Sequence, residues 1–329
     1  MAHAWTLASR PQGMAVAENF ALIDLGDAPL GEGEVRVRNR WLSVDPYMRG
    51  RMNDVKSYTP PFQIGEAMQG GAIGEVVESR SDQFKPGDMV QHMAGWRDEA
   101  VVPASQLQPL PQLAVDPQAY LGQLGMPGMT AFFGLLEVAS AKEGDTVFVS
   151  AAAGAVGSTV VQIAKAKGMR VIGSAGGAEK CAWVESLGAD AVIDYKADLP
   201  VVKALGAAAR TGIDVYFDNV GGEHLDAALA HANAGARFAI CGMIDVYNSG
   251  AATQLRYLAR LIGMRIRMQG FIVSDYASRA PEFYREMGGW LQDGKLRREE
   301  TIVDGLEAMP DAFLGLFTGS NRGKMLVRV

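Results

Sequence analysis

A short apolar run followed by a turn of small residues constrains this chain most. Residues 145–150 carry Val147, Phe148 and Val149 in succession, which predicts a buried parallel strand. Small residues fill the turn at 151–157, and the apolar residues beyond it share one face of a helix. A strand, a small-residue turn and a helix N-terminus form an anion site, because the first helical N–H groups have no partner within the helix.

The turn matches the G-x-G-x-x-G pattern of dinucleotide-binding folds at two of its three glycine positions. Ala152, Gly154 and Gly157 occupy these positions, so the first glycine is missing. In this pattern the second glycine admits a pyrophosphate, and the third lets the helix pack closely on the strand. The segment therefore favours dinucleotide binding, while an ordinary tight strand-helix junction stays an alternative.

The end of the next strand indicates which dinucleotide binds. NAD-binding folds place an Asp or Glu there, roughly 20 residues past the turn, for the ribose 2′-hydroxyl. This chain instead has Ser174 at the end of the strand 169–174, with Lys180 shortly after it. These residues suit a 2′-phosphate, and Tyr195 after the following strand can close over it. The pattern favours NADP over NAD, although Lys180 alone also fits a solvated helix and Tyr195 alone a packing residue.

The pattern along the chain predicts two domains. With 329 residues, the chain is long for a single core. Residues 1–120 show short strands separated by Pro and Gly turns, which is typical of a barrel-like β domain. From residue 121 strands alternate with helices, the signature of a parallel sheet, and we expect the last strand, 324–329, to return to the first domain. The expected parallel strands are 145–150, 169–174, 190–194, 213–218 and 235–241, with 265–273 as a candidate sixth.

Charge and hydropathy exclude several classes of partner. The net charge of −6 argues against nucleic acids and anionic membranes, which require concentrated basic charge. No run of ~18 apolar residues occurs, and residues 1–10 contain no apolar signal segment. We therefore expect a cytoplasmic protein with no membrane and no nucleic-acid partner.

The few cysteines and histidines limit the chemistry further. Cys181 and Cys241 are the two cysteines, which excludes a disulfide framework and a four-cysteine zinc site. The four histidines form no H-E-x-x-H motif, so we expect no metal, and we interpret His92 as structural or surface. No G-x-S-x-G serine supports hydrolase chemistry.

Motifs spread over nearly the whole chain carry a resemblance to a known family. The sequence resembles the medium-chain dehydrogenase/reductase superfamily, in its zinc-free branch of alkenal, leukotriene and prostaglandin reductases. That branch includes bacterial NADPH-dependent curcumin reductases. The motifs lie at residues 42–49, 125–134, 151–157, 217–222, 240–248, 267–273 and 321–324.

The resemblance implies an α/β fold, with a doubly wound Rossmann parallel sheet and a GroES-like β-barrel domain. Residues 1–120, with a return strand within 300–329, would form the substrate and catalytic domain. Residues 121–299 would form the NADP-binding domain. The family also implies a small-molecule enone or alkenal substrate, no zinc, and a homodimer with an edge strand near 265–273 as the contact.

The resemblance further implies roles for individual residues. Tyr247 would be the catalytic residue that hydrogen-bonds the substrate carbonyl. Tyr47, Met126 and Pro127 would shape the substrate pocket, although Tyr47 and Met126 also fit core positions. The other positions would hold NADP: Gly154, Ala155, Val156 and Gly157 at the pyrophosphate, Lys180 and Tyr195 beside Ser174 at the 2′-phosphate, Asn219, Cys241, Gly242 and Met243 at the ribose and nicotinamide, Phe271, Ile272 and Val273 at the carboxamide, and Asn321 from the C-terminal return.

Residue chemistry agrees with the placement of two of these segments. Asp218 and Asn219 follow one apolar strand, and Cys241 and Gly242 follow another, where open α/β sheets bind ligands. As alternatives, Asp218 and Asn219 also fit a helix cap and Gly242 an ordinary turn. Cys241 fits a small buried hydrophobe better than a nucleophile.

The expected reaction is NADPH-dependent reduction of the C=C bond of α,β-unsaturated aldehydes and ketones. Hydride adds to the β-carbon, and Tyr247 with a cofactor ribose hydroxyl stabilises the enolate oxygen, while solvent protonates the α-carbon. Two alternatives stay open: a zinc-free NADPH:quinone oxidoreductase, and a non-catalytic NADPH-binding structural protein. We expect residues 248–254 to form a mobile flap over the pocket, which leaves the natural substrate open.

Overall fold

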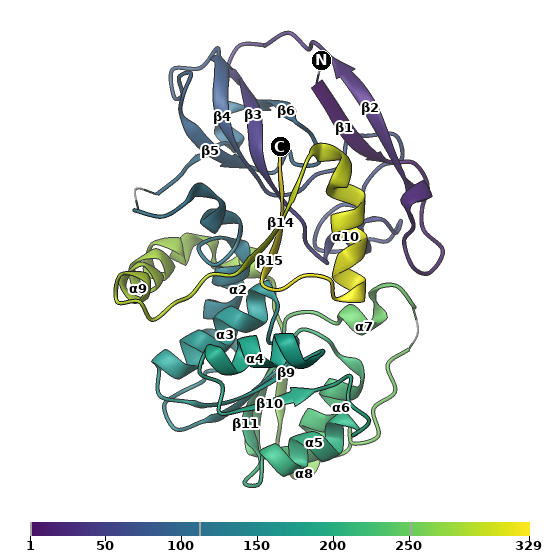
Figure 1. Ribbon diagram of the computed structural model, residues 1–329, viewed down its shortest axis with the longest axis vertical. Helices are drawn as coiled ribbons and strands as arrows, with labels where there is room; N and C mark the ends of the chain where they lie inside the picture. The colour runs from purple at the N-terminus through teal and green to yellow at the C-terminus, as the bar shows by residue number, and fades with distance from the viewer. Residues whose placement is uncertain (1, 112, 251) are drawn as a thin grey trace. The chain divides into compact units, whose positions relative to one another are not determined.

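The computed structural model describes residues 2–111, 113–250 and 252–329 (Figure 1). The chain divides into two compact units, one made of Met1–Leu121 with Glu300–Val329, and the other of Gly122–Glu299. Ala251, in the segment predicted as a flap, lies outside the described residues.

The first unit is built on a seven-stranded, mostly antiparallel sheet. β3 (Glu34–Ser43) lies at its centre and pairs antiparallel with β4, β6 and β15. The β15 pairing joins the C-terminal strand to strands from the first part of the chain. The other strands are β1 (Ala2–Leu7), β2 (Phe20–Gly26), β4 (Ala72–Ser79), β5 (Met89–His92), β6 (Glu99–Pro103), β7 (Gln108–Pro109), β14 (Glu300–Asp304) and β15 (Lys324–Arg328), and the helices are α1 (Met48–Arg51) and α10 (Met309–Thr318).

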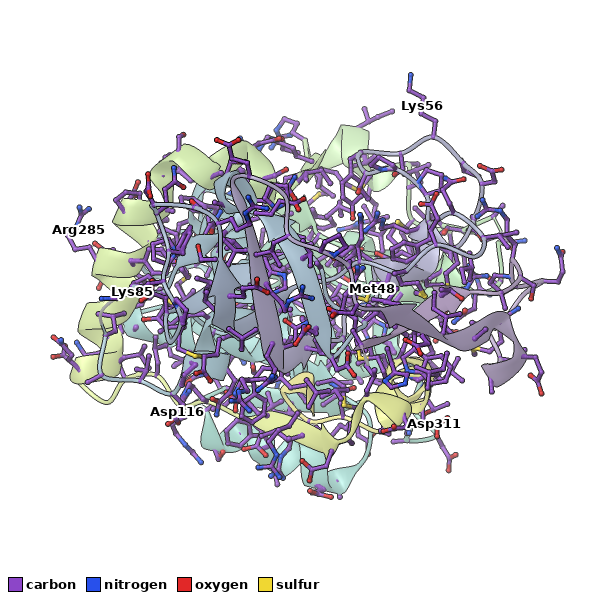
Figure 2. The ribbon with its side chains drawn as sticks, turned by 90° about the horizontal axis from the view of Figure 1, so that it is seen from above. Met48, Lys56, Lys85, Asp116, Arg285 and Asp311 are labelled. Carbon is purple, nitrogen blue, oxygen red and sulfur yellow. The ribbon has the colours of Figure 1, made fainter. Side chains whose placement is uncertain are left out.

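The alternation of side chains along β3 creates the core of this unit. Val35 and Val37 are fully buried with other valines, while Arg36 between them points outward and pairs with carboxylates of neighbouring strands. A second cluster combines aliphatic side chains with aromatic ones, and in it the rings of Phe20 and Trp96 stack with centroids 5.6 Å apart. Exposure varies within the unit: in Figure 2 the Lys56 side chain projects away from the ribbon, whereas Met48 lies among other side chains.

The second unit contains a six-stranded sheet in which every pair of neighbours is parallel. Numbered by their order in this unit, the strands follow 3-2-1-4-5-6, the arrangement of a doubly wound nucleotide-binding sheet. This confirms the predicted fold class, and it places the switch point of the topology between β8 and β11. The strands are β8 (Thr146–Val149), β9 (Arg170–Ala175), β10 (Ala191–Asp194), β11 (Ile213–Asp218), β12 (Ala232–Ile240) and β13 (Arg267–Gly270).

Helices cover the parallel sheet because its strands are apolar on both faces. α5 and α6 pack against each other and over the face that carries Phe148, Tyr216 and Phe238, while α3 packs against α2. None of the described helices is long and apolar enough to cross a membrane. The helices of this unit are α2 (Met126–Phe133), α3 (Ala155–Ala166), α4 (Ala178–Ser186), α5 (Val201–Ala208), α6 (Gly222–His231), α7 (Ile244–Tyr247), α8 (Arg260–Gly263) and α9 (Ala280–Gln292).

Each unit contains one buried histidine that is held neutral. Burial lowers the pKa of His92 from 6.5 to about 4, and it lowers the pKa of His224 to about 4 as well. The His92 ring is fixed in one tautomer, because Nδ1 accepts the N–H of Ala94 at 3.1 Å and Nε2 therefore donates to Oδ1 of Asn39 at 2.9 Å. His92 is thus structural, one of the two roles predicted for it.

We predict that acid destabilises the protein through these histidines. Their pKa values are lower in the folded state, so their contribution to stability is complete above pH 6.5 and is lost as the pH falls toward 4. The full shift corresponds to about 3 kcal/mol for each histidine. Urea unfolding at pH 7 and pH 4.5 measures the loss.

The matched control is His92→Gln, which can accept from Ala94 and donate to Asn39 without titrating. Between pH 7 and pH 4.5, the free energy of unfolding of this variant should fall by about 2 kcal/mol less than that of the wild type. Identical pH dependence in the two proteins would contradict the assignment for His92.

Candidate functional site

The turn after β8 forms an anion site. Ala151 adopts a left-handed conformation with φ of 48°, and α3 begins at Ala155 with Gly154 as its uncapped N-terminal boundary. The first helical bond runs from the N–H of Ser158 to the carbonyl of Gly154, at 2.9 Å. The N–H groups of residues 155–157 have no partner among the described residues, so they are available to a phosphate.

Ala152, at the position of the missing first glycine, lies within the turn, and the left-handed residue of this turn is the preceding Ala151. The methyl group of Ala152 lies beside Gly173 of β9, where an added Cβ would come within 2.9 Å of it. Gly157 keeps the role of the third glycine, because a Cβ there would lie 2.3 Å from the carbonyl oxygen of Ala151.

The ends of β9 and β10 carry the residues predicted for a 2′-phosphate. Ser174 is fully buried, and its Oγ has no hydrogen-bond partner among the described residues. Lys180 lies in the first turn of α4, and burial lowers its pKa. Tyr195 is 39% exposed, with its hydroxyl over Gly176. The structure therefore places Tyr195 at an accessible strand end and Ser174 in the core.

The sequence analysis did not identify one further residue at the ends of β9 and β10. Lys196 is exposed, and its side chain lies over Gly176 together with Tyr195. Its position could have indicated a role in binding, because Lys196 directly follows Tyr195 at the carboxyl end of a predicted strand.

At the switch point, Asn219 ties the end of β11 to the end of β8. Its backbone N–H donates to Oγ of Ser150 at 2.9 Å, and its side-chain amide donates to the carbonyl of Ser150 at 2.8 Å. The side-chain oxygen of Asn219 is not used in these bonds. The amide is thus fixed in orientation, with an acceptor left for a ligand.

Asp218 organises the loops around this point. Its Oδ1 accepts hydrogen bonds from the hydroxyl of Tyr216 at 2.7 Å and from the backbone N–H groups of Val220 and Gly221 at 2.9 and 2.8 Å. Its Oδ2 has no partner among the described residues, and burial raises the pKa of the carboxyl. Asp218 therefore shapes the turn before α6, a structural role close to the helix cap considered from the sequence.

The loop after β12 brings Tyr247 to the residues predicted to hold the cofactor. The backbone N–H groups of Cys241 and Gly242 donate to the carbonyl of Asp218 at 2.9 and 3.0 Å. The Tyr247 hydroxyl accepts the N–H of Met243 at 3.3 Å and lies 3.0 Å from where a Cβ on Gly242 would be. Burial and the nearby Asp218 carboxylate raise the pKa of Cys241 to about 12, which keeps it a thiol.

Other predicted residues of the second unit lie at element ends. Phe271 follows β13 directly, and its ring packs edge-on against Phe217 with centroids 6.3 Å apart. Ile272 and Val273 continue this segment and are half-buried. At the start of α2, Met126 is exposed, as a pocket wall requires, whereas Pro127 is buried.

The first unit holds the remaining two predicted residues. Tyr47 is half-buried beside α1, and burial, followed by the Asp45 carboxylate, raises its pKa, so its phenol stays protonated. Asn321 precedes β15, and its side-chain amide donates to the carbonyl of Gly323 at 2.9 Å. Asp45 is itself paired with buried Lys324 at 2.9 Å.

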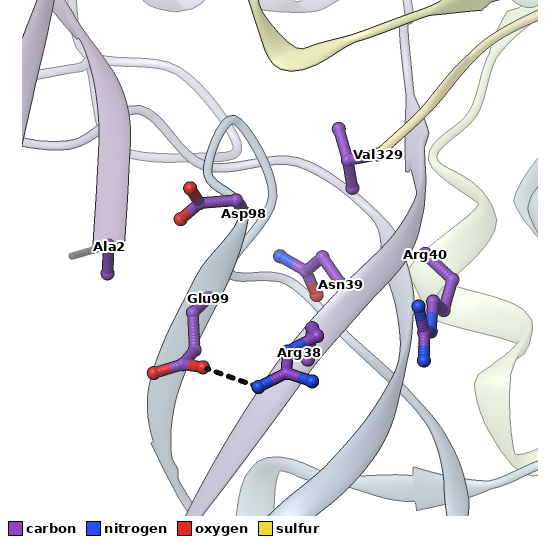
Figure 3. A pocket seen from close by; sticks show the side chains of 7 residues that line it. All are labelled: Ala2, Arg38, Asn39, Arg40, Asp98, Glu99 and Val329. Carbon is purple, nitrogen blue, oxygen red and sulfur yellow. Dashed lines mark ion pairs between the residues drawn. The ribbon is translucent and has the colours of Figure 1, made fainter.

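A surface hollow of about 340 Å³ in the first unit contains none of the predicted residues (Figure 3). Arg38 and Glu99 face each other across it at 3.9 Å. Its lining consists of Ala2, Arg38, Asn39, Arg40, Asp98, Glu99 and Val329. Within residues 2–111, 113–250 and 252–329, no group of three or more His, Cys, Asp or Glu side chains is arranged to hold a metal ion.

Comparisons with known proteins find oxidoreductases similar to nearly the whole chain. Residues 3–110 match a family model described as the N-terminal domain of oxidoreductase, and residues 155–292 match one described as zinc-binding dehydrogenase. The chain is 46% identical to the NADPH-dependent curcumin reductase of Escherichia coli, covering 99% of this chain and 96% of that protein. It is 42% identical to the NADP(+)-dependent 2-alkenal reductase of Nicotiana tabacum, covering 92% and 89%.

A solved structure is similar over nearly the full length of the chain. The crystal structure of CurA from Vibrio vulnificus in complex with NADPH superposes with a TM-score of 0.94 at 45% identity, covering 99% of both chains.

We predict that the Asp218 carboxylate acts through one oxygen. Asp218→Ala leaves two buried N–H groups without their acceptor, and the Tyr216 hydroxyl keeps only the longer contact with Oγ of Ser150 at 3.2 Å. The free energy of unfolding should fall by about 3 kcal/mol. Asp218→Asn keeps an oxygen that can accept all of these bonds and should lose only about 1 kcal/mol. Chemical denaturation of both variants measures the difference. Equal losses would show that the Oδ1 bonds do not hold this turn.

Proposed function

The chain belongs to the medium-chain dehydrogenase/reductase family, and from this membership we propose that it reduces the C=C bond of α,β-unsaturated aldehydes and ketones with NADPH. One observation carries the proposal: three features lie at the carboxyl ends of the parallel strands, where such sheets bind ligands. They are the uncapped N-terminus of α3, the Asn219 amide held by Ser150, and the Tyr247 hydroxyl next to Met243. Two of the relatives named above are called a curcumin reductase and a 2-alkenal reductase, and these names support the proposed substrate class. The second unit would bind NADPH and the first the substrate.

The residues at the strand ends fit this cofactor. The N–H groups of residues 155–157 suit the pyrophosphate, and Lys180 and Tyr195 suit the 2′-phosphate. When bound, NADPH supplies a hydride to the β-carbon of the enone. The remaining proposed contacts are Gly154 at the pyrophosphate, Ser174 near the 2′-phosphate, Asn219, Cys241, Gly242 and Met243 at the ribose and nicotinamide, Phe271, Ile272 and Val273 at the carboxamide, and Asn321.

Tyr247 has the chemistry to stabilise the product of hydride addition. As the β-carbon gains hydride, the π electrons of the C=C bond move toward the carbonyl, and negative charge develops on its oxygen. A neutral phenol that donates a hydrogen bond stabilises this oxygen without transferring its proton. The α-carbon takes its proton from solvent, so no second acid is required. Tyr47, Met126 and Pro127 would contact the apolar part of the substrate.

We also propose a homodimer formed through the outer strand of the parallel sheet. β13 is the last strand in the sheet order, and all its residues are exposed. Met268 on this strand is 38% exposed and Ile262 in α8 is 84% exposed, so apolar surface lies beside an unpaired edge. Sedimentation should give a dimer for the wild type and more monomer for Met268→Lys. A monomeric wild type would refute the arrangement.

We predict selective turnover of enones with NADPH. Loss of NADPH absorbance is followed with 2-alkenals, aryl enones and simple quinones, and each assay is repeated with NADH. Enone turnover that prefers NADPH supports the proposal. Turnover of quinones alone would move the chain to quinone reduction, and NADPH binding with no turnover would make it a non-catalytic binding protein.

A second prediction tests the role of Tyr247. Tyr247→Phe should lower kcat by ~10-fold or more, less than the ~10²–10³ lost with a sole oxyanion donor. The dissociation constant for NADPH should stay near the wild-type value. Tyr257→Phe is the matched control, because Tyr257 is a partly exposed tyrosine of the same unit outside the proposed site. Unchanged kcat in Tyr247→Phe would remove Tyr247 from the mechanism.

A further inference from the structure

We propose that Lys196 is a specificity-determining residue, whose ammonium group binds the 2′-phosphate of the cofactor together with Lys180. The inference rests on the proposed use of NADPH and deepens it, because it assigns the selection of a phosphomonoester to a pair of cations.

The backbone fixes Lys196 next to the turn that follows β9. Asp194 and Ala175 are paired in the parallel sheet, so β9 and β10 end side by side. Oδ1 of Asp194 accepts the N–H of Gly177 at 2.8 Å and the N–H of Lys196 at 2.9 Å. One carboxylate oxygen therefore joins the two loops and sets the start of the Lys196 side chain.

Gly176 brings the side chains of Tyr195 and Lys196 to one place. A Cβ at Gly176 would lie 2.6 Å from the hydroxyl of Tyr195 and 3.0 Å from Cε of Lys196. Both side chains thus occupy the space that any other residue would fill. An exposed lysine would normally extend freely into solvent, but here its stem lies against the backbone.

The charges at this end of the sheet favour a dianion. Lys180 and Lys196 are close enough that the charge of Lys196 contributes, after burial, to the lowered pKa of Lys180. Among the described residues, Lys196 forms no ion pair within 4.0 Å, although its charge also acts on Asp194. The charge of Lys196 disfavours the charged form of Lys180, and that of Glu179 favours it. A phosphate dianion bound by both lysines would offset their mutual repulsion.

Tyr195 is supported from behind by a neutral ring. The His224 ring meets Tyr195 edge-on with centroids 5.5 Å apart and stacks on Phe148 at 6.4 Å. Since burial lowers the pKa of His224 to about 4, this ring adds no charge at neutral pH. The cationic character of the site therefore comes from Lys180 and Lys196.

The test compares Lys196→Gln with Lys203→Gln, a control at an exposed lysine on α5. Calorimetry gives dissociation constants for NADPH, NADH and adenosine 2′,5′-bisphosphate. Lys196→Gln should weaken NADPH and the bisphosphate ~10-fold, as expected for one charge-assisted contact, and leave NADH unchanged. The control should change none of them. Equal weakening of NADPH and NADH, or unchanged NADPH binding, would overturn the proposal.

Gly176→Ala provides a second variant that keeps every charge. The added methyl group must displace Tyr195 and Lys196, so NADPH should bind more weakly while NADH binding and the unfolding midpoint stay the same. Unaltered NADPH binding in this variant would also count against the site. Because the bisphosphate assay requires no turnover, a protein that binds it through Lys196 but reduces no enone would refute only the proposed function.

Discussion

The bond between the ends of β8 and β11 is the constraint on which the site depends. Asn219 donates twice to Ser150, and Asp218 beside it accepts the N–H groups of the following turn. The carbonyl of Asp218 in turn holds the first residues of the loop that carries Tyr247. Because these bonds join neighbouring strands at the switch point, the sheet fixes the distance between the turn before α3 and the loop after β12.

Regular periodicity made the parallel sheet predictable. The apolar runs at 145–150 and 213–218 correspond to β8 and β11, and the six expected strands all occur, with ends shifted by a few residues. The turn after β8 was recognisable from its small residues, but the sequence did not indicate that the Ala152 methyl group fits beside Gly173. That fit depends on a neighbouring strand, which local sequence does not contain.

The residues that sequence reasoning missed act between loops. Lys196 gains its position from Asp194, which also binds the turn of the neighbouring strand, and from a glycine twenty residues earlier that leaves room for it. Asp218 was predicted at a strand end as a ligand or a helix cap, but the sequence did not indicate that its carboxylate accepts the Tyr216 hydroxyl from the same face of β11. Strand patterns predict where such residues begin, and the tertiary register decides which of them meet.

The two ends of the site differ in charge, and this difference orients an asymmetric ligand. At β9 and β10, Lys180 and Lys196 lie near each other, and the Asp194 carboxylate between the strand ends accepts the backbone N–H groups of Gly177 and Lys196. At β11 and β12 the polar groups are amides and hydroxyls, together with a buried carboxyl whose pKa is raised. A dinucleotide with a phosphomonoester on one ribose and a neutral ring on the other therefore has one favourable direction. Reversing it would place the dianion beside Asp218, where burial already disfavours a negative charge.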